Sequence, residues 1–202
     1  MNFFIAALVG YVFGSVPFAL VIGKLFYNTD VREHGSKNLG ASNAGRVLGK
    51  KAAFSIAFLD TSKAAIAVWI AFLLFGQEVA IVAGIATSLG HCFPLFAKFK
   101  GGKAVSTAAG YLLALSFLSQ TNGWIIGLIP VFVFFGLLKL FKMVSLASIS
   151  AVTTATILLF LLQTNLMISI SFSIVAVIVI VRHHENIGRI MAGTERKIKW
   201  MG

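Results

Sequence analysis

Residues 90–110 read GHCFPLFAKFKGGKAVSTAAG, and this stretch decides the class of the protein. Three lysines within six residues, Lys98, Lys100 and Lys103, flank a Gly-Gly pair, and long apolar runs continue on both sides. A short basic turn between apolar runs is typical of a connection between membrane helices, because Lys and Arg gather in cytoplasmic loops. The rest of the chain extends the same pattern.

The composition indicates a membrane protein. The 202 residues are 58% hydrophobic and 11% charged, with a mean hydropathy of +0.95, whereas soluble domains carry ~25% charged residues. Seventeen Lys and Arg face only six Asp and Glu, which in so apolar a chain favours basic cytoplasmic loops over a nucleic-acid partner. The single cysteine, Cys92, excludes an internal disulfide and a multi-cysteine metal site. The amino-terminal run lacks a basic n-region, so we expect no cleavable signal.

Seven apolar runs approach the ~20 residues that a membrane helix needs. They cover residues 2–26, 53–75, 79–96, 104–119, 123–141, 144–162 and 165–182. The predicted fold class is therefore all-α, a polytopic integral membrane protein with seven transmembrane helices in a single domain over residues 1–202. The breaks that contain no Lys or Arg are 76–78, 119–123 and 163–165. The basic connections are 27–52, 97–103, 142–143 and the tail from 183.

The basic residues fix the predicted orientation. Fifteen of the 17 lie in these connections, in the tail or at adjoining helix ends, and the exceptions are Lys24 and Lys63. Seven spans place every basic connection on one side, which the positive-inside rule makes cytoplasmic. Six or eight spans would break this parity. We therefore predict an extracytoplasmic amino-terminus and a cytoplasmic carboxyl-terminus.

The first basic connection is dense in small polar residues. Its glycines let backbone approach a ligand closely, and Arg46 suits bidentate contact with phosphate or carboxylate. The alternative is a flexible surface loop whose charge only sets topology. The candidate ligand-binding residues are Ser36, Asn38, Gly40, Ser42, Asn43 and Arg46.

The second and third basic segments also carry candidates. Gly101, Gly102 and Lys103, with Lys100, resemble a phosphate cradle at the start of a helix, although a plain topology anchor would look the same. In the tail, His183, Asn186 and Arg189 are spaced to share one face of a short helix. The alternative there is an interfacial helix with no catalytic role. We expect no metal site, because adjacent histidines point in different directions.

Four residues are assigned structural roles. Asp60 and Lys63 stand at i and i+3 inside a span, where charges are rare and usually paired or functional, and a mutual brace is favoured over a substrate contact. His91 suits either a core position or a cavity. Glu195 is an acid in a basic tail and is expected to tie that tail to a cationic loop.

Three segments taken together resemble a known family. GSKNLGASNAGR (35–46), GHCFPLFAKFKGGKAVSTA (90–108) and RHHENIGRIMAGTE (182–195) are similar to the signature segments of the bacterial membrane glycerol-3-phosphate acyltransferases that use acyl phosphate as donor. LDTSK (59–63) and KMVSLASI (142–149), which contains Ser145, resemble intervening segments. Lys37, Ser42 and Ala104 depart from the pattern, where the family more often has a small residue, Thr and Gly.

The resemblance implies transfer of an acyl group from acyl phosphate to the sn-1 hydroxyl of glycerol 3-phosphate, giving lysophosphatidic acid and phosphate at the cytoplasmic face of the bacterial inner membrane. It implies two phosphate substrates, the lipid bilayer as surroundings, no cofactor, no metal and no nucleic acid, and we expect a monomer. The implied catalytic residues are Ser36, His183 and Asn186. The implied substrate-binding residues are Asn38, Gly40, Ser42, Asn43, Arg46, Lys100, Gly101, Gly102, Lys103, Ser145 and Arg189. Either His183 or a substrate phosphate takes the proton, and both remain open.

Two other functions were weighed. A transporter for a phosphorylated metabolite would also need basic loops, but such proteins often show internal repeats, and none is evident. An assembly subunit would leave the polar density of the first loop unexplained. The H-x-x-x-x-D motif of acyltransferases that use acyl-CoA is absent, since Leu39, Phe96, Gly188 and Arg189 stand five residues after the four histidines.

Overall fold

The structure is a computed structural model that describes residues 1–118 and 122–198. The described residues form ten α-helices and one short 3₁₀ helix, with no strand among them. The chain divides into two compact units, residues 1–111 and 112–202, and each is described by itself. The predicted break at 119–121 and the end of the tail at 199–202 lie outside the described residues.

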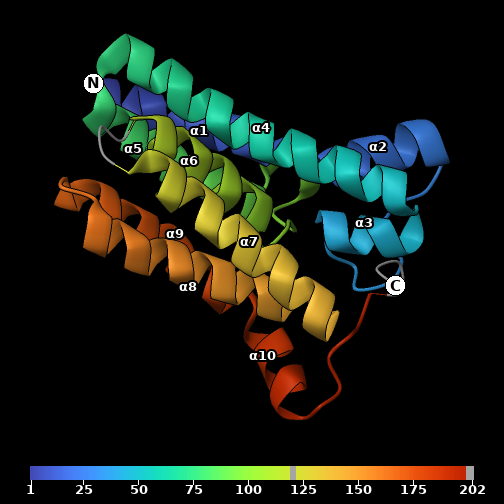
Figure 1. Ribbon diagram of the computed structural model, residues 1–202. Helices are drawn as coiled ribbons and strands as arrows, with labels where there is room; N and C mark the ends of the chain where they lie inside the picture. The colour runs from blue at the N-terminus through green and yellow to red at the C-terminus, as the bar shows by residue number, and fades with distance from the viewer. Residues whose placement is uncertain (119–121, 199–202) are drawn as a thin grey trace. The chain divides into compact units, whose positions relative to one another are not determined.

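The first unit contains three long apolar segments and the polar connections between them (Figure 1). Its elements are α1 (Asn2–Ser15), α2 (Phe18–Tyr27), α3 (Ala41–Val47), α4 (Lys50–Phe75), α5 (Gln77–Cys92), η1 (Leu95–Ala97) and the start of α6 (Val105–Leu118). The predicted first span is therefore two helices, because Pro17 has no backbone N–H to continue α1. The predicted third span ends as an α-helix at Cys92, before Pro94.

Small residues bring α1 and α5 into direct backbone contact. A Cβ on Gly10 would lie 2.6 Å from the carbonyl oxygen of Ala83, and one on Gly14 would overlap that of Thr87. Gly10 and Gly14 form a G-x-x-x-G pair, which lets membrane helices approach closely. A Cβ on Gly90 of α5 would in turn overlap the carbonyl oxygen of Tyr11. This close packing fixes the end of α5, where His91 lies.

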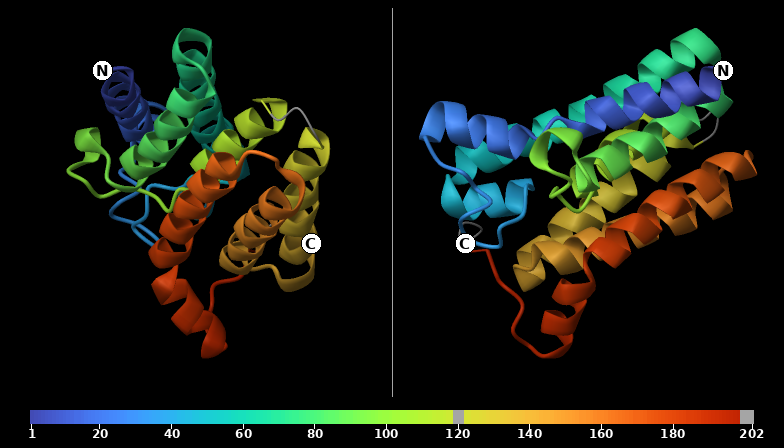
Figure 2. Two further views of the ribbon diagram at one scale, coloured as in Figure 1. Left: turned by 90° about the vertical axis from the view of Figure 1, so that its left-hand side faces the viewer. Right: turned by 180° about the vertical axis from the view of Figure 1, so that it is seen from behind.

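The second unit consists of long apolar helices and the tail. It contains α7 (Gly123–Phe141), α8 (Val144–Leu162), α9 (Leu166–Arg182) and α10 (His184–Met191). Helices α8 and α9 lie side by side (Figures 1 and 2), and Ser169 Oγ donates to the carbonyl of Leu159 across them at 2.9 Å. The tail after α10 packs back within this unit, since the Ile198 N–H donates to the carbonyl of Lys142 at 2.8 Å.

Five of the described segments are long and apolar enough to cross a membrane, and the number becomes six if α9 and α10, bent by 58°, count as one span. Helix α6 is shorter, at 14 residues, which gives ~21 Å against a ~30 Å hydrocarbon core. Among the described residues, each of the seven predicted apolar runs is mostly helical. The all-helical membrane fold is confirmed, whereas the count of seven spans and the orientation stay predictions.

Candidate active site

Asn43 organises the loop between α2 and α3. Its side-chain Oδ1 accepts from the Ser36 N–H at 2.7 Å, and its Nδ2 donates to the carbonyls of Val31 at 2.9 Å and His34 at 3.2 Å. The residue is 1% exposed. Gly35 has a φ of +63°, and a Cβ there would overlap Asn43 Oδ1. Asn43, predicted to contact substrate, thus uses both amide hydrogens to hold the loop that presents Ser36.

An ion pair closes the start of the same loop. Arg32 donates to Asp30 through Nε at 2.9 Å and Nη2 at 2.6 Å, and Lys24 Nζ lies 3.7 Å from Asp30. The hydrogen bond from Arg32 lowers the pKa of Asp30 to about 2. Lys24, one of the two basic residues assigned to a span from the sequence, therefore pairs with an acid at the end of α2.

The two predicted phosphate-binding segments of the first unit meet. Asn38 Nδ2 donates to the carbonyl of Gly101 at 3.4 Å, a long hydrogen bond between residues 63 positions apart. Ser36 is exposed in the loop, as is Arg46 on α3, while Gly40 and Ser42 are half-buried at the start of that helix. Asn38 of the first loop therefore lies beside the Gly-Gly turn.

Both glycines of that turn pack against His91. The Gly102 N–H donates to the carbonyl of His91 at 2.9 Å, so this group of the predicted cradle serves the fold. A Cβ on Gly101 would overlap that same carbonyl oxygen and lie 2.7 Å from the carbonyl oxygen of Cys92, while a Cβ on Gly102 would overlap His91 Nε2. Glycine is required at both positions because the end of α5 leaves no room for a side chain.

The lysines of this segment surround the turn. Lys100 is exposed and Lys103 is half-buried, directly before α6. Lys98, Phe99 and Ala104 have φ values of +54°, +58° and +58°, a left-handed conformation that side chains disfavour. Ala104 stands where the family more often has Gly, and its backbone explains that preference. The backbone between Lys98 and Ala104 therefore follows a tight path with three left-handed residues.

A buried polar cluster lies behind the turn. Lys63 Nζ is 2.6 Å from Asp60 Oδ1, 2.8 Å from the carbonyl oxygen of Val16 and 3.3 Å from His91 Nδ1. His91 Nδ1 is also 3.5 Å from Asp60 Oδ1. The two charges of α4 therefore pair with each other. The Val16 carbonyl, at the break before Pro17, is the member that the sequence reading missed, although the proline inside an apolar run marks its position.

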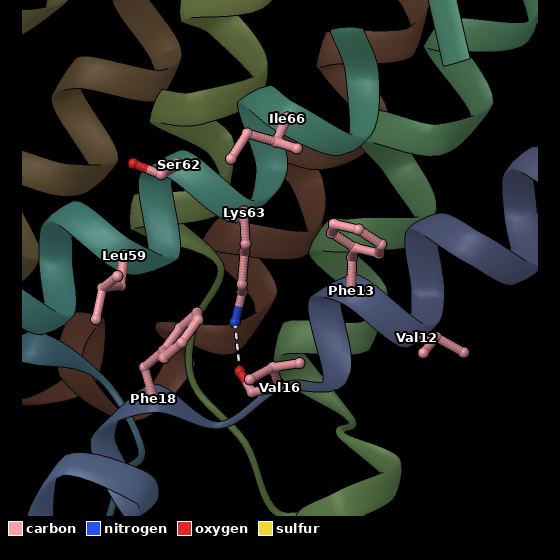
Figure 3. Close-up of a pocket in the computed structure, with 8 residues that line it drawn as sticks. All are labelled: Val12, Phe13, Val16, Phe18, Leu59, Ser62, Lys63 and Ile66. Carbon is pink, nitrogen blue, oxygen red and sulfur yellow. Dashed lines mark hydrogen bonds between the residues drawn. The ribbon is translucent and has the colours of Figure 1, made fainter. Parts of the chain in front are cut away.

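An apolar hollow of about 340 Å³ borders this cluster (Figure 3). Phe13 and Phe18 line it beside Lys63, whose Nζ reaches the Val16 carbonyl. The ammonium also lies 5.5 Å from the centroid of the Phe18 ring, within cation–π range. Leu59 and other apolar side chains of α1 and α4 complete the wall.

In the second unit, Glu195 gathers the tail residues. Its Oε1 accepts from Asn186 Nδ2 at 2.7 Å and from Ser145 Oγ at 2.9 Å, and its Oε2 accepts from Arg189 Nε at 2.8 Å. Burial would raise the pKa of Glu195, but the hydrogen bonds from Asn186, Arg189 and Ser145 outweigh it and lower that pKa below its usual range. Glu195 thus ties the tail to α8 and α10.

His183 lies at the junction of α9 and α10, just outside the helix that carries Asn186 and Arg189. Its Nδ1 is 2.7 Å from the carbonyl oxygen of Val179. A carbonyl only accepts, so Nδ1 carries the hydrogen and Nε2 is the basic nitrogen of the neutral ring. The ring is 4% exposed. This tautomer suits a group that orients or accepts a proton through Nε2.

Within the described ranges, no three His, Cys, Asp or Glu residues are grouped as metal ligands. The Asp60 carboxylate instead pairs with Lys63 in the first unit. In the second unit, the Glu195 carboxylate binds Arg189 and the Asn186 amide. The Gly-Gly turn has Lys100 and Lys103 on either side in the sequence and the Asn38 amide beside it. Such a set binds anions.

Comparison with known proteins agrees with this chemistry. The sequence family described as glycerol-3-phosphate acyltransferase matches residues 4–193. Over an alignment of 212 residues, which covers both chains fully, this chain is 41% identical to a glycerol-3-phosphate acyltransferase of Staphylococcus aureus strain Newman. A relative from strain JH9 is 40% identical over 210 residues, again covering both chains fully.

Solved structures show the same similarity. The crystal structure of PlsY (YgiH), an integral membrane glycerol 3-phosphate acyltransferase, in its glycerol 3-phosphate form has a TM-score of 0.90 and 36% identity, covering 98% of this chain and 96% of that one. Its lysophosphatidic acid form has a TM-score of 0.87 and 34% identity, with the same coverage. The chain described here belongs to the glycerol-3-phosphate acyltransferase family.

Proposed function

We propose that this protein transfers an acyl group from acyl phosphate to the sn-1 hydroxyl of glycerol 3-phosphate, releasing lysophosphatidic acid and inorganic phosphate at the cytoplasmic face of a bacterial inner membrane. The observation that carries the proposal is the meeting of the first loop and the Gly-Gly turn at the Asn38–Gly101 hydrogen bond. Relatives described as glycerol-3-phosphate acyltransferases support the acceptor. The transporter is not proposed further, since family membership favours the enzyme.

The residues of the first unit suit two phosphates. Two anions repel each other, and a cluster of cations offsets that repulsion. We assign Lys103, assisted by Lys100, to the phosphate of glycerol 3-phosphate. Ser36, Asn38 and Arg46 are assigned to the acyl phosphate, where the planar guanidinium suits bidentate contact. Gly102 N–H is excluded from these assignments, because it bonds to His91.

Phosphate is a good leaving group, so positioning and charge stabilisation supply most of the catalysis. In the second unit, His183 and Asn186 are assigned to the attacking hydroxyl. The basic Nε2 of His183 permits general-base catalysis, and proton transfer to a substrate phosphate is the alternative. We assign to Glu195 the role of orienting the Asn186 amide, because its carboxylate accepts a hydrogen bond from Asn186 Nδ2.

The test of the reaction uses the purified protein with glycerol 3-phosphate and palmitoyl phosphate and no other enzyme. Phosphate and lysophosphatidic acid are expected to appear in equal amounts. The Lys103→Ala variant should weaken glycerol 3-phosphate binding by about 1–3 kcal/mol, the range for charged hydrogen bonds. Absence of both products with the folded wild-type protein removes the proposal, and an unchanged KM and kcat in Lys103→Ala removes the lysine assignment.

We assign the apolar hollow beside Lys63 to the acyl tail of the donor. Most of the side chains that line it are apolar. Lys63, which also lines it, contacts His91, and His91 in turn contacts Gly102 of the Gly-Gly turn. Each buried methylene contributes ~0.8 kcal/mol, so the volume of the hollow should set chain-length preference. Phe13→Ala enlarges it and is expected to raise kcat/KM for palmitoyl phosphate relative to lauroyl phosphate. Leu73→Ala, at a side chain of α4 that is 74% exposed, is the control, and an equal shift in both variants contradicts the assignment.

A further inference from the structure

The polar cluster of Asp60, Lys63 and His91 lies next to the Gly-Gly turn and contains more contacts than the ion pair between its two charges. Lys63 Nζ forms an ion pair with Asp60 Oδ1 at 2.6 Å, donates to the Val16 carbonyl oxygen at 2.8 Å and lies 3.3 Å from His91 Nδ1. His91 Nδ1 also lies 3.5 Å from Asp60 Oδ1, so both members of the pair face one edge of the ring. These contacts fix the orientation of the His91 ring.

The opposite edge of that ring meets the turn. A Cβ on Gly102 would overlap Nε2 and lie 2.8 Å from Cδ2 and 2.9 Å from Cε1 of His91. The backbone of His91 holds the same glycine, since its carbonyl accepts the Gly102 N–H at 2.9 Å. The His91 side chain is 7% exposed, with Lys63 and Asp60 on one edge of the ring and glycine backbone on the other. Any rotation of the ring must move the turn.

We propose that His91 is a positioning residue that sets the backbone of Gly101 and Gly102, with the Asp60–Lys63 pair fixing its ring. This inference rests on the proposed function for its kinetic consequence, because the turn carries Lys100 and Lys103. On this proposal the two glycines are needed to fit against the end of α5, whether or not they contact substrate. Gly102 is small because the His91 ring occupies the space, and Gly101 is small because Pro94 and the backbone carbonyls of His91 and Cys92 do.

A double-mutant cycle tests this contact. Gly102→Ala should lower Tm and raise the KM for glycerol 3-phosphate at least tenfold, because the new methyl group pushes the turn off the ring. His91→Asn removes the far half of the ring and keeps an acceptor for Lys63. In the His91→Asn background, Gly102→Ala is expected to change Tm and KM by less than half as much. Equal effects in both backgrounds overturn the proposal.

Gly110→Ala is the matched control. A Cβ on Gly110 would overlap the carbonyl oxygen of Thr61, a clash with α4 that His91 does not share. Its effect on Tm should therefore be the same with and without His91→Asn, as expected for independent sites. If Gly102→Ala alone yields no folded protein, folding of the double variant supports the contact. Failure of the double variant while His91→Asn folds overturns it.

The readouts separate this inference from the reaction. The Tm cycle measures the His91–Gly102 contact whether or not acyl transfer occurs, so an inactive wild-type protein would remove the proposed function alone. The role of the Asp60–Lys63 pair has its own readout. Asp60→Leu/Lys63→Met removes both contacts to that edge of the His91 ring and should reduce the effect of Gly102→Ala on Tm, as His91→Asn does. An undiminished effect of Gly102→Ala in this background shows that the pair does not fix the ring.

Discussion

The two units each use one carboxylate to organise polar groups, but they do so in different surroundings. In the first unit, Asp60 pairs with Lys63 inside α4, and the two side chains are 1% and 5% exposed. In the second, Glu195 lies in the tail beyond α10 and accepts from Ser145, Asn186 and Arg189. Neither acid is placed as a nucleophile. Each orients neighbours that carry the chemistry.

The difference lies in what remains when the acid is removed. Without Asp60, the Lys63 ammonium stays inside an apolar helix, where an unpaired charge is costly. Without Glu195, Asn186 loses an acceptor and Arg189 still has Glu185, whose Oε2 lies 3.6 Å away and whose side chain is 69% exposed. The first cluster should therefore control folding, and the second should mainly control activity.

The largest effect is expected from Asp60→Leu. Leaving one partner of a buried ion pair uncompensated costs about 3–5 kcal/mol of unfolding free energy, measured as loss of thermal stability in detergent. The double variant Asp60→Leu/Lys63→Met removes both charges and should regain most of that loss. If the double variant is as unstable as the single one, the pair does not act as a unit.

Glu195→Gln should act more on rate than on folding. It keeps an acceptor but loses the charge that holds Arg189 and Asn186, and hydrogen bonds to charged groups contribute about 1.5–3 kcal/mol. We expect kcat/KM to fall by roughly 10- to 100-fold, with a loss of Tm smaller than that of Asp60→Leu. Glu185→Gln on α10 is the control and should leave kcat/KM within about twofold. Equal losses of kcat/KM in the two variants would contradict the role of Glu195 in orienting Asn186 and Arg189.

The smallest effect is a pH dependence. The pKa of Glu195 is lower in the folded protein than its ordinary value of 4.5, so its stabilisation is complete above that pH and is lost as the pH falls through the folded value. The Tm difference between wild type and Glu195→Gln should therefore be constant from pH 7 to about pH 5 and shrink towards pH 3. A difference that does not change over this range would show that the carboxylate is not stabilised by its donors.

The apolar pattern predicted where the helices lie but not how they break. Within the described residues each predicted run is mostly helical, because ~20 apolar residues have few alternatives in a bilayer. The interruption at Pro17 was readable from its missing N–H. The sequence also indicates the close contact of α1 with α5, because the spacing of Gly10 and Gly14 permits direct backbone approach.

For the candidate site, the sequence predicts a set of residues but not the contacts that these residues make. Loop composition indicated Asn43 and Gly102 as ligand groups, whereas the structure commits the Asn43 amide and the Gly102 N–H to internal partners. Sequence spacing cannot reveal such use, because the partners Val31 and His91 become neighbours only through tertiary packing. The pairing of Asp60 with Lys63 was accessible, since residues three apart share a helix face.

The lone thiol of the chain has a practical consequence. Cys92 is fully buried at the end of α5, with its backbone carbonyl against Gly101. A maleimide dye should therefore react slowly with the native protein and faster whenever this helix end opens. One unmodified side chain thereby provides a built-in optical reporter, and cysteines introduced elsewhere for mapping the two faces of the membrane would be labelled over a quiet background.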